Sequence, residues 1–145
     1  MTTDRPIGLA DLIRDRRHIL ELRLATPGEL EEITGGIDHG GGLKGYLRGW
    51  QAIAIVDHQA DATTLHLVGY HSMRSWITSD LLVISPDRSL VRTRNSIYGL
   101  GGRAEADLSL SHLITVSRAL QAWGLVDRYG LELARVDDIA VRGDE

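Results

Sequence analysis

Six histidines have the widest chemical range in this sequence, because a neutral imidazole can bind a metal ion or accept a proton near neutral pH. A metal site could combine His66 and His71 with His39, Asp57 and His58. The spacing is unfavourable, because residues five apart on a strand face opposite sides and no HExxH or HxxxH pair is present. We therefore interpret the histidines as isolated, hydrogen-bonded residues and expect no metal and no cofactor.

Nucleophilic catalysis would need a serine beside a histidine base and an orienting carboxylate. The sequence offers many combinations, drawn from Ser72, Ser75, Ser79 and Ser96 with His66, His71 or His112, and with Asp57 or Asp80. No GxSxG nucleophile elbow selects one of them. A small hydrolase or metal-dependent enzyme using His66 or His71 is therefore a secondary hypothesis, and no catalytic residue is assigned.

Two glycine-rich segments invite comparison with phosphate-binding loops. Residues 99–104, GLGGRA, loosely match the dinucleotide fingerprint, but the strand before them belongs to a hairpin and the next helix begins too late. Residues 35–42, GGIDHGGG, lack the Gly-Lys-Ser/Thr ending of a phosphate-binding loop. Both segments are predicted to be connecting loops.

Arginines form the most interesting chemical group. Arg88 follows a turn, and Arg92 and Arg94 project from one face of the next strand by two-residue alternation. Guanidinium groups can hold phosphate or carboxylate through paired hydrogen bonds. The alternative is a solvated strand face, with Asn95 pointing inward on the other side and needing partners for its amide.

Aromatic side chains near these arginines would complete a recognition surface. Tyr70 and Trp76 are the candidates, and Trp50 and Tyr98 also lie in or beside strands. Because the chain has no phenylalanine, the same rings could instead fill the core, and strand register decides between the two. The predicted binding residues are Arg88, Arg92, Arg94, Tyr70 and Trp76.

Composition limits the functional classes. The 145 residues are 43% hydrophobic and 25% charged, as in globular proteins, and include no cysteine for disulfides or thiolate chemistry. A net charge of −4 argues against a general nucleic-acid binder. Residues 1–8 lack the apolar stretch of a signal peptide, and no run of about eighteen apolar residues could span a membrane. We expect a cytoplasmic protein with no membrane contact.

The elements that would position these residues follow from periodicity. Apolar residues recur at helical spacing over residues 9–24, which predicts an amphipathic helix. The sequence Thr26-Pro27-Gly28-Glu29 has the form of a capping box and predicts a second, short helix that ends near Thr34. Residues 109–123 predict the strongest helix, capped by Ser109 or Asp107 and ended by Gly124.

Four strands are predicted between these helices. Residues 46–56 and 63–70 are joined by a polar loop, and residues 76–84 and 90–98 by the turn 85–89, in which Pro86 fixes the backbone and Asp87 bonds it. Short connections join spatial neighbours, so an antiparallel meander is expected. The tail beyond Tyr129 could add a short strand or helix.

The predicted fold is one α+β domain over residues 1–145, with a helical part at 9–34, a four- or five-stranded antiparallel sheet at 45–98 and a helix at 109–123. Helices are expected on one face of the sheet. Because catalytic signatures are missing, we expect a small protein-interaction module, such as an inhibitor or accessory regulator of a larger complex. The alternative is nucleic-acid or phosphorylated-ligand binding through the arginine strand. Either terminal helix could also form a homodimer contact.

Overall fold

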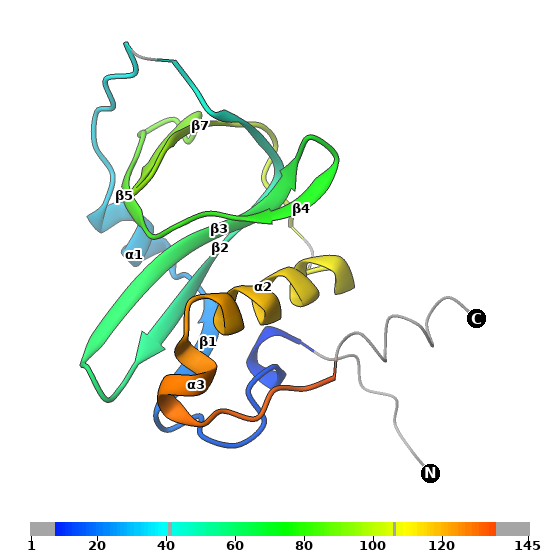
Figure 1. Cartoon of the computed structure of the whole chain (residues 1–145). Coiled ribbons are helices and arrows are strands. Elements are labelled where there is room, and N and C mark those ends of the chain that lie inside the picture. The colour runs from blue at the N-terminus through cyan, green and yellow to red at the C-terminus, as the bar shows by residue number, and fades with distance from the viewer. Residues whose placement is uncertain (1–7, 41, 106, 136–145) are drawn as a thin grey trace.

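The computed structural model describes residues 8–40, 42–105 and 107–135, and within them the protein is α+β with one seven-stranded, mostly antiparallel sheet (Figure 1). The strands are β1 (Leu20–Leu24), β2 (Gly45–Asp57), β3 (Ala62–His71), β4 (Arg74–Ile77), β5 (Leu81–Ile84), β6 (Leu90–Thr93) and β7 (Ile97–Leu100). The helices are α1 (Pro27–Glu32), α2 (Leu110–Ala122) and α3 (Leu125–Tyr129), and a 3₁₀ turn spans Leu9–Asp11.

The sheet is larger than the predicted four or five strands and is not a single meander. Its order is β4-β3-β2-β7-β6-β5, and β1 pairs with β2 outside this path. The predicted pairings of residues 46–56 with 63–70 and of the segments flanking turn 85–89 are confirmed as β2–β3 and β5–β6. Strands β2, β3 and β4 form one antiparallel group, and strands β5, β6 and β7 form another. The parallel pairing of β2 with β7 joins the two groups.

Two predicted strands are each divided. Residues 76–84 cover the end of β4 and all of β5, and residues 90–98 cover all of β6 and the start of β7. The second break is held by Thr93, whose hydroxyl accepts hydrogen bonds from the backbone N–H groups of Asn95 and Ser96. Local side-chain bonds of this kind compete with the strand ladder, and here they turn the chain back on itself.

The predicted helix over residues 9–24 is wrong. Leu20 and Leu22 are buried and alternate with Glu21 and Arg23, so the segment forms β1 and pairs antiparallel with the end of β2. Apolar and polar residues alternate over residues 20–24, which fits a strand, while the apolar spacing over the whole of residues 9–24 fits a helix. The segment becomes a strand because β2 offers its backbone hydrogen-bonding groups beside it.

The two other predicted helix starts are confirmed. Thr26 accepts a hydrogen bond from the Glu29 N–H, and the Glu29 carboxylate accepts one from the Thr26 N–H. Glu29 also bonds the Arg23 guanidinium at 2.7 and 2.9 Å, which lowers the pKa of Glu29 to about 2. Ser109 caps α2 through the His112 N–H, and Gly124, with φ +78°, follows the helix in the left-handed region.

The sheet carries apolar clusters on both of its sides, and β2 contributes to both. Ile53 and Ile55 pack with Leu113 and Leu120 of α2, whereas Trp50 packs in a second cluster enclosed by β5, β6 and β7. Leu30 of α1 belongs to that second cluster. The expectation that all helices share one face of the sheet is therefore wrong, because α1 and α2 cover different clusters.

The ends of the chain are only partly described. Leu133 forms an isolated bridge with Ile13. Residues 1–7 and 136–145, and Gly41 and Ala106 in the two predicted loops, lie outside the described residues. In the described part of the chain, no helix is long and apolar enough to cross a membrane. The single-domain organisation stays a prediction.

Candidate functional site

The three predicted binding arginines each have different partners. Arg88 lies in the turn 85–89 and donates hydrogen bonds to Thr34 Oγ1 at 2.9 Å and to the Ser85 carbonyl at 3.1 Å. Arg92 donates to the Asp38 carbonyl at 3.2 Å, and Arg94 binds the Asp80 carboxylate. The common face expected for Arg92 and Arg94 is interrupted, because β6 ends at Thr93.

The predicted aromatic partners lie elsewhere. Tyr70 packs against His112 of α2, with ring centroids 4.5 Å apart. Trp76 donates a hydrogen bond to the Tyr98 hydroxyl at 3.1 Å and lies against His71. Trp50 is 1% exposed and therefore belongs to the core. Asn95 is exposed rather than inward, because it lies in the turn after β6.

The two histidines considered as metal ligands, His66 and His71, also have different neighbours. His66 is buried beside Trp123, whereas the ring of His71 lies against Trp76. Among the described residues, no group of three or more His, Asp or Glu side chains is arranged to hold a metal ion.

One of the considered serine–histidine pairs does meet. Ser75 Oγ lies 2.6 Å from His112 Nδ1, and Thr115 Oγ1 lies 2.7 Å from Ser75 Oγ. Burial lowers the pKa of His112. Within the described chain no carboxylate is hydrogen-bonded to His112, so the orienting third member of a catalytic triad is missing there. The contact fastens the first turn of α2 to β4.

A cleft of about 540 Å³ is lined by residues of β1, β2 and β3, of the segments just before β5 and just after β6, and of α3 and the C-cap of α2. We call it the His66 cleft. Its lining residues are Leu20, Ile55, Asp57, Ala62, Thr64, His66, Ser79, Asp80, Arg94, Trp123, Leu125 and Arg128. The accessible surface of the lining is largely apolar, and four charged side chains, Asp57, Asp80, Arg94 and Arg128, also contribute to it.

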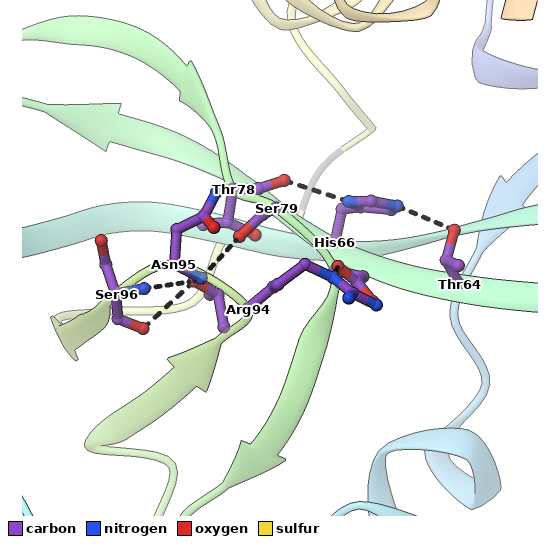
Figure 2. Close-up of polar contacts among 9 residues, drawn as sticks. Thr64, His66, Thr78, Ser79, Arg94, Asn95 and Ser96 are labelled. Atoms are coloured by element: carbon purple, nitrogen blue, oxygen red, sulfur yellow. Dashed lines mark hydrogen bonds and ion pairs between the residues drawn. The ribbon is translucent and has the colours of Figure 1, made fainter. Parts of the chain in front are cut away.

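His66 is held rigidly in this wall, between Thr64 and Thr78 (Figure 2). Its Nδ1 lies 3.0 Å from the Thr78 carbonyl, which can only accept, so Nδ1 carries the proton. Its Nε2 then accepts from the Thr64 hydroxyl at 2.9 Å. Burial lowers the pKa of His66, which agrees with a neutral ring. Both nitrogens are engaged, so His66 presents its ring face and not a free donor or acceptor.

The second ring in the lining of the cleft is the indole of Trp123, which faces the His66 ring. It is the C-cap residue of α2, and its indole stacks on His66 with centroids 4.9 Å apart and 27° between the planes. Trp123 remains 39% exposed. A large ring this exposed at the mouth of an apolar cleft has surface available for a ligand or a partner.

The lining of the cleft carries both signs of charge. Asp80 accepts two hydrogen bonds from Arg94, at 2.9 and 3.0 Å, and they hold its pKa below the ordinary value. Burial opposes ionisation of Asp57, but hydrogen bonds from the Tyr129 hydroxyl and from backbone N–H groups outweigh it, and the pKa of Asp57 is also lowered. Arg128 lies beside Asp57. The lining thus contains two carboxylates and two guanidiniums, of which Asp80 and Arg94 are directly bonded.

Sequence reasoning identified His66, Arg94 and Asp80 individually but did not bring them together, and it missed Arg128 as a site residue. For Trp123 the sequence indicated only a place on or near the apolar stripe of the C-terminal helix, because contacts with His66 and α3 decide how much of its ring is covered. No protein-family model, curated protein or solved structure matches the chain.

Proposed function

We propose that the protein is a non-catalytic binding protein that receives an apolar side chain of a protein partner in the His66 cleft. The observation that carries this proposal is the exposed ring of Trp123 over a largely apolar cleft of about 540 Å³. Tryptophan is enriched among the few residues that dominate binding energy at protein interfaces.

The polar groups of the cleft favour binding over catalysis. Both nitrogens of His66 are used inside the protein, so the ring would have to break a hydrogen bond before it could move a proton or bind a metal. The Asp80 carboxylate is engaged by Arg94. A reacting group would therefore find no poised base or nucleophile among these three side chains.

The charge pattern indicates a protein rather than a small apolar molecule as the occupant. An apolar centre surrounded by a polar rim is the usual anatomy of a protein interface. Asp57, Asp80, Arg94 and Arg128 give the lining both signs of charge, so a matching partner places one aliphatic or aromatic side chain in the cleft and polar residues beside it. As part of the same proposal, the protein acts in the cytoplasm as an inhibitor or accessory regulator.

The test is an affinity purification from the native cells at low and high salt, with three tagged forms. The wild type and Met73→Ala, a matched change at an exposed residue outside the cleft, are expected to retain the same protein. Trp123→Ala is expected to lose it, and the purified partner should bind this variant at least tenfold more weakly, as for other interface hot spots.

A second variant separates the loss of binding from a loss of folding. Ala62→Arg places a charged side chain at an exposed position of the cleft without removing packing, and it should abolish the same interaction. Equal retention of the partner by all four forms would contradict the proposal. A wild type that retains only a second copy of itself, through the cleft, would replace the foreign partner with a homodimer.

A further inference from the structure

A second surface, on the outer side of β2, β7 and β6, has a different composition. Tyr46 is opposite Gly99, and Gly99 is opposite Leu90, so these residues share one face of the sheet. By alternation Arg48, Ile97 and Arg92 lie on the same side, while Leu47, Tyr98 and Val91 between them are buried. We call the surface of Tyr46, Arg48, Leu90, Arg92, Ile97 and Gly99 the Tyr46 face.

Tyr46 lies flat on this face. A Cβ atom added to Gly99 would stand 2.3 Å from Tyr46 Cε1 and 2.5 Å from Cδ1, so the ring rests directly on the glycine backbone. Tyr46 is nevertheless 63% exposed. One side of the ring is therefore covered by β7, and the other side is open to stacking.

The cations on and beside the Tyr46 face form no ion pair with a carboxylate of the described residues. Six arginines elsewhere, at positions 14, 16, 17, 23, 88 and 94, form ion pairs with carboxylates. Within the described residues, Arg48 and Arg92 form none, and neither does Lys44 just before β2. Residues 45–50, 90–93 and 97–100 contain no Asp or Glu. The face is locally positive although the chain as a whole carries −4.

We propose that the Tyr46 face binds single-stranded nucleic acid. Arg92 donates a hydrogen bond to the Asp38 carbonyl, which leaves its charge in place. An open aromatic ring flanked by arginines that no carboxylate neutralises is the combination that holds such strands, because the ring stacks on a base and the guanidiniums contact the phosphates. Gly99 has no side chain, so the Tyr46 ring can lie against the backbone of β7 with one face turned outward. A duplex presents no open base faces, and a single strand therefore fits better than a double helix.

This site is separate from the proposed partner cleft. Tyr46, Arg48 and Arg92 do not line the His66 cleft. Figure 1 shows β7 at the end of the molecule away from α3. Loss of one activity therefore does not predict loss of the other, and the two proposals can fail independently.

The test is a fluorescence anisotropy titration of the full chain with labelled oligo(dT) and oligo(U) of about 12 nucleotides. Binding is expected at about 50 mM salt and should weaken steeply towards 200 mM. Tyr46→Leu should weaken binding roughly tenfold, whereas Tyr46→Phe, which keeps the ring, should not. Arg48→Ala should also lower the slope of log affinity against log salt by about 0.7, the loss of one phosphate contact.

Arg118→Ala is the charge-matched control, because Arg118 is an exposed arginine on α2, remote in sequence from the face. It is expected to leave the affinity and the salt slope nearly unchanged. The proposal is overturned if the oligonucleotides do not bind at low salt, if Arg118→Ala weakens binding as much as Arg48→Ala, or if polyglutamate of equal charge competes as well as unlabelled oligonucleotide.

Discussion

The imidazole of His66 on β3 stacks on the indole of Trp123 at the end of α2, with ring centroids 4.9 Å apart. At the beginning of α2 the histidine belongs to the helix and the aromatic ring to the sheet: His112 packs against Tyr70 of β3, with ring centroids 4.5 Å apart. Both imidazoles are buried and each is hydrogen-bonded to a hydroxyl group. The two ends of α2 are thus fastened to the sheet by neutral histidines.

This arrangement predicts that acid weakens the fold. Burial lowers the pKa of His66 and of His112 below the ordinary value of 6.5, so the unfolded chain binds protons that the folded chain excludes. The stabilisation is present above pH 6.5 and is lost as the pH falls below it. Urea unfolding between pH 8 and pH 5, about 1.5 units either side of that value, should show a falling free energy of unfolding.

A variant isolates the contribution of His66. His66→Gln should reduce the pH dependence of the free energy of unfolding over that range, because one of the two excluded protons is removed. His39→Gln, at an exposed loop position, should leave the dependence unchanged. Equal slopes for the wild type and His66→Gln would show that His66 is not a neutral anchor.

Trp50 should be essential for stability and not for binding. It is 1% exposed, and its Nε1 donates a hydrogen bond to the Gly101 carbonyl at 3.0 Å. Trp50→Ala removes a large buried ring and is expected to lower the free energy of unfolding by about 3 to 5 kcal/mol. A loss below about 1 kcal/mol in chemical denaturation would contradict this placement, because losses that small are typical of surface positions.

Gly99 and Tyr46 should be energetically coupled. Gly99→Ala places a methyl group where the Tyr46 ring lies, which is expected to cost about 1 to 3 kcal/mol by overpacking. In a Tyr46→Ala background the methyl group has room, so most of that cost should vanish. A double-mutant cycle from thermal or urea unfolding measures the difference, and simple additivity would show that the two residues are not in contact.

A substitution in the hairpin loop between β3 and β4 should stabilise the protein. Ser72 and Met73 form its two-residue loop, with φ values of +51° and +65°, a region that disfavours residues with a Cβ atom. Met73 is 85% exposed, so its side chain contributes little packing. Met73→Gly is expected to raise the free energy of unfolding by about 1 kcal/mol, and an unchanged or lower melting temperature would oppose this.

The parts of the fold that the sequence predicted correctly depend on local bonds. The capping box of Thr26 and Glu29, the cap at Ser109 and the turn closed by Asp87 each involve residues within a few positions of one another. Their stabilising contacts are local in sequence, so they can be read without knowing the tertiary structure. The same holds for the β2–β3 hairpin, whose polar loop separates two strongly apolar runs.

The errors concern segments whose partners are distant in sequence. Residues 20–24 become a strand because β2, some thirty residues later, presents an edge to Leu22 through Ile55. The parallel pairing of Tyr46 with Gly99 has no local signal either. The His66 cleft joins β2, β3, the turn at Arg94 and α3, so neither its existence nor the role of Arg128 follows from periodicity.

The most direct test of the central claim is photo-crosslinking at the His66 cleft. A photoreactive phenylalanine analogue at Ala62, an exposed cleft residue, should trap a protein partner in the native cells, and the same analogue at Met73 should not. The Ala62 crosslink should also disappear when Trp123→Ala is added. A partner trapped at Met73 and not at Ala62, or a crosslink at Ala62 that survives Trp123→Ala, would contradict the account.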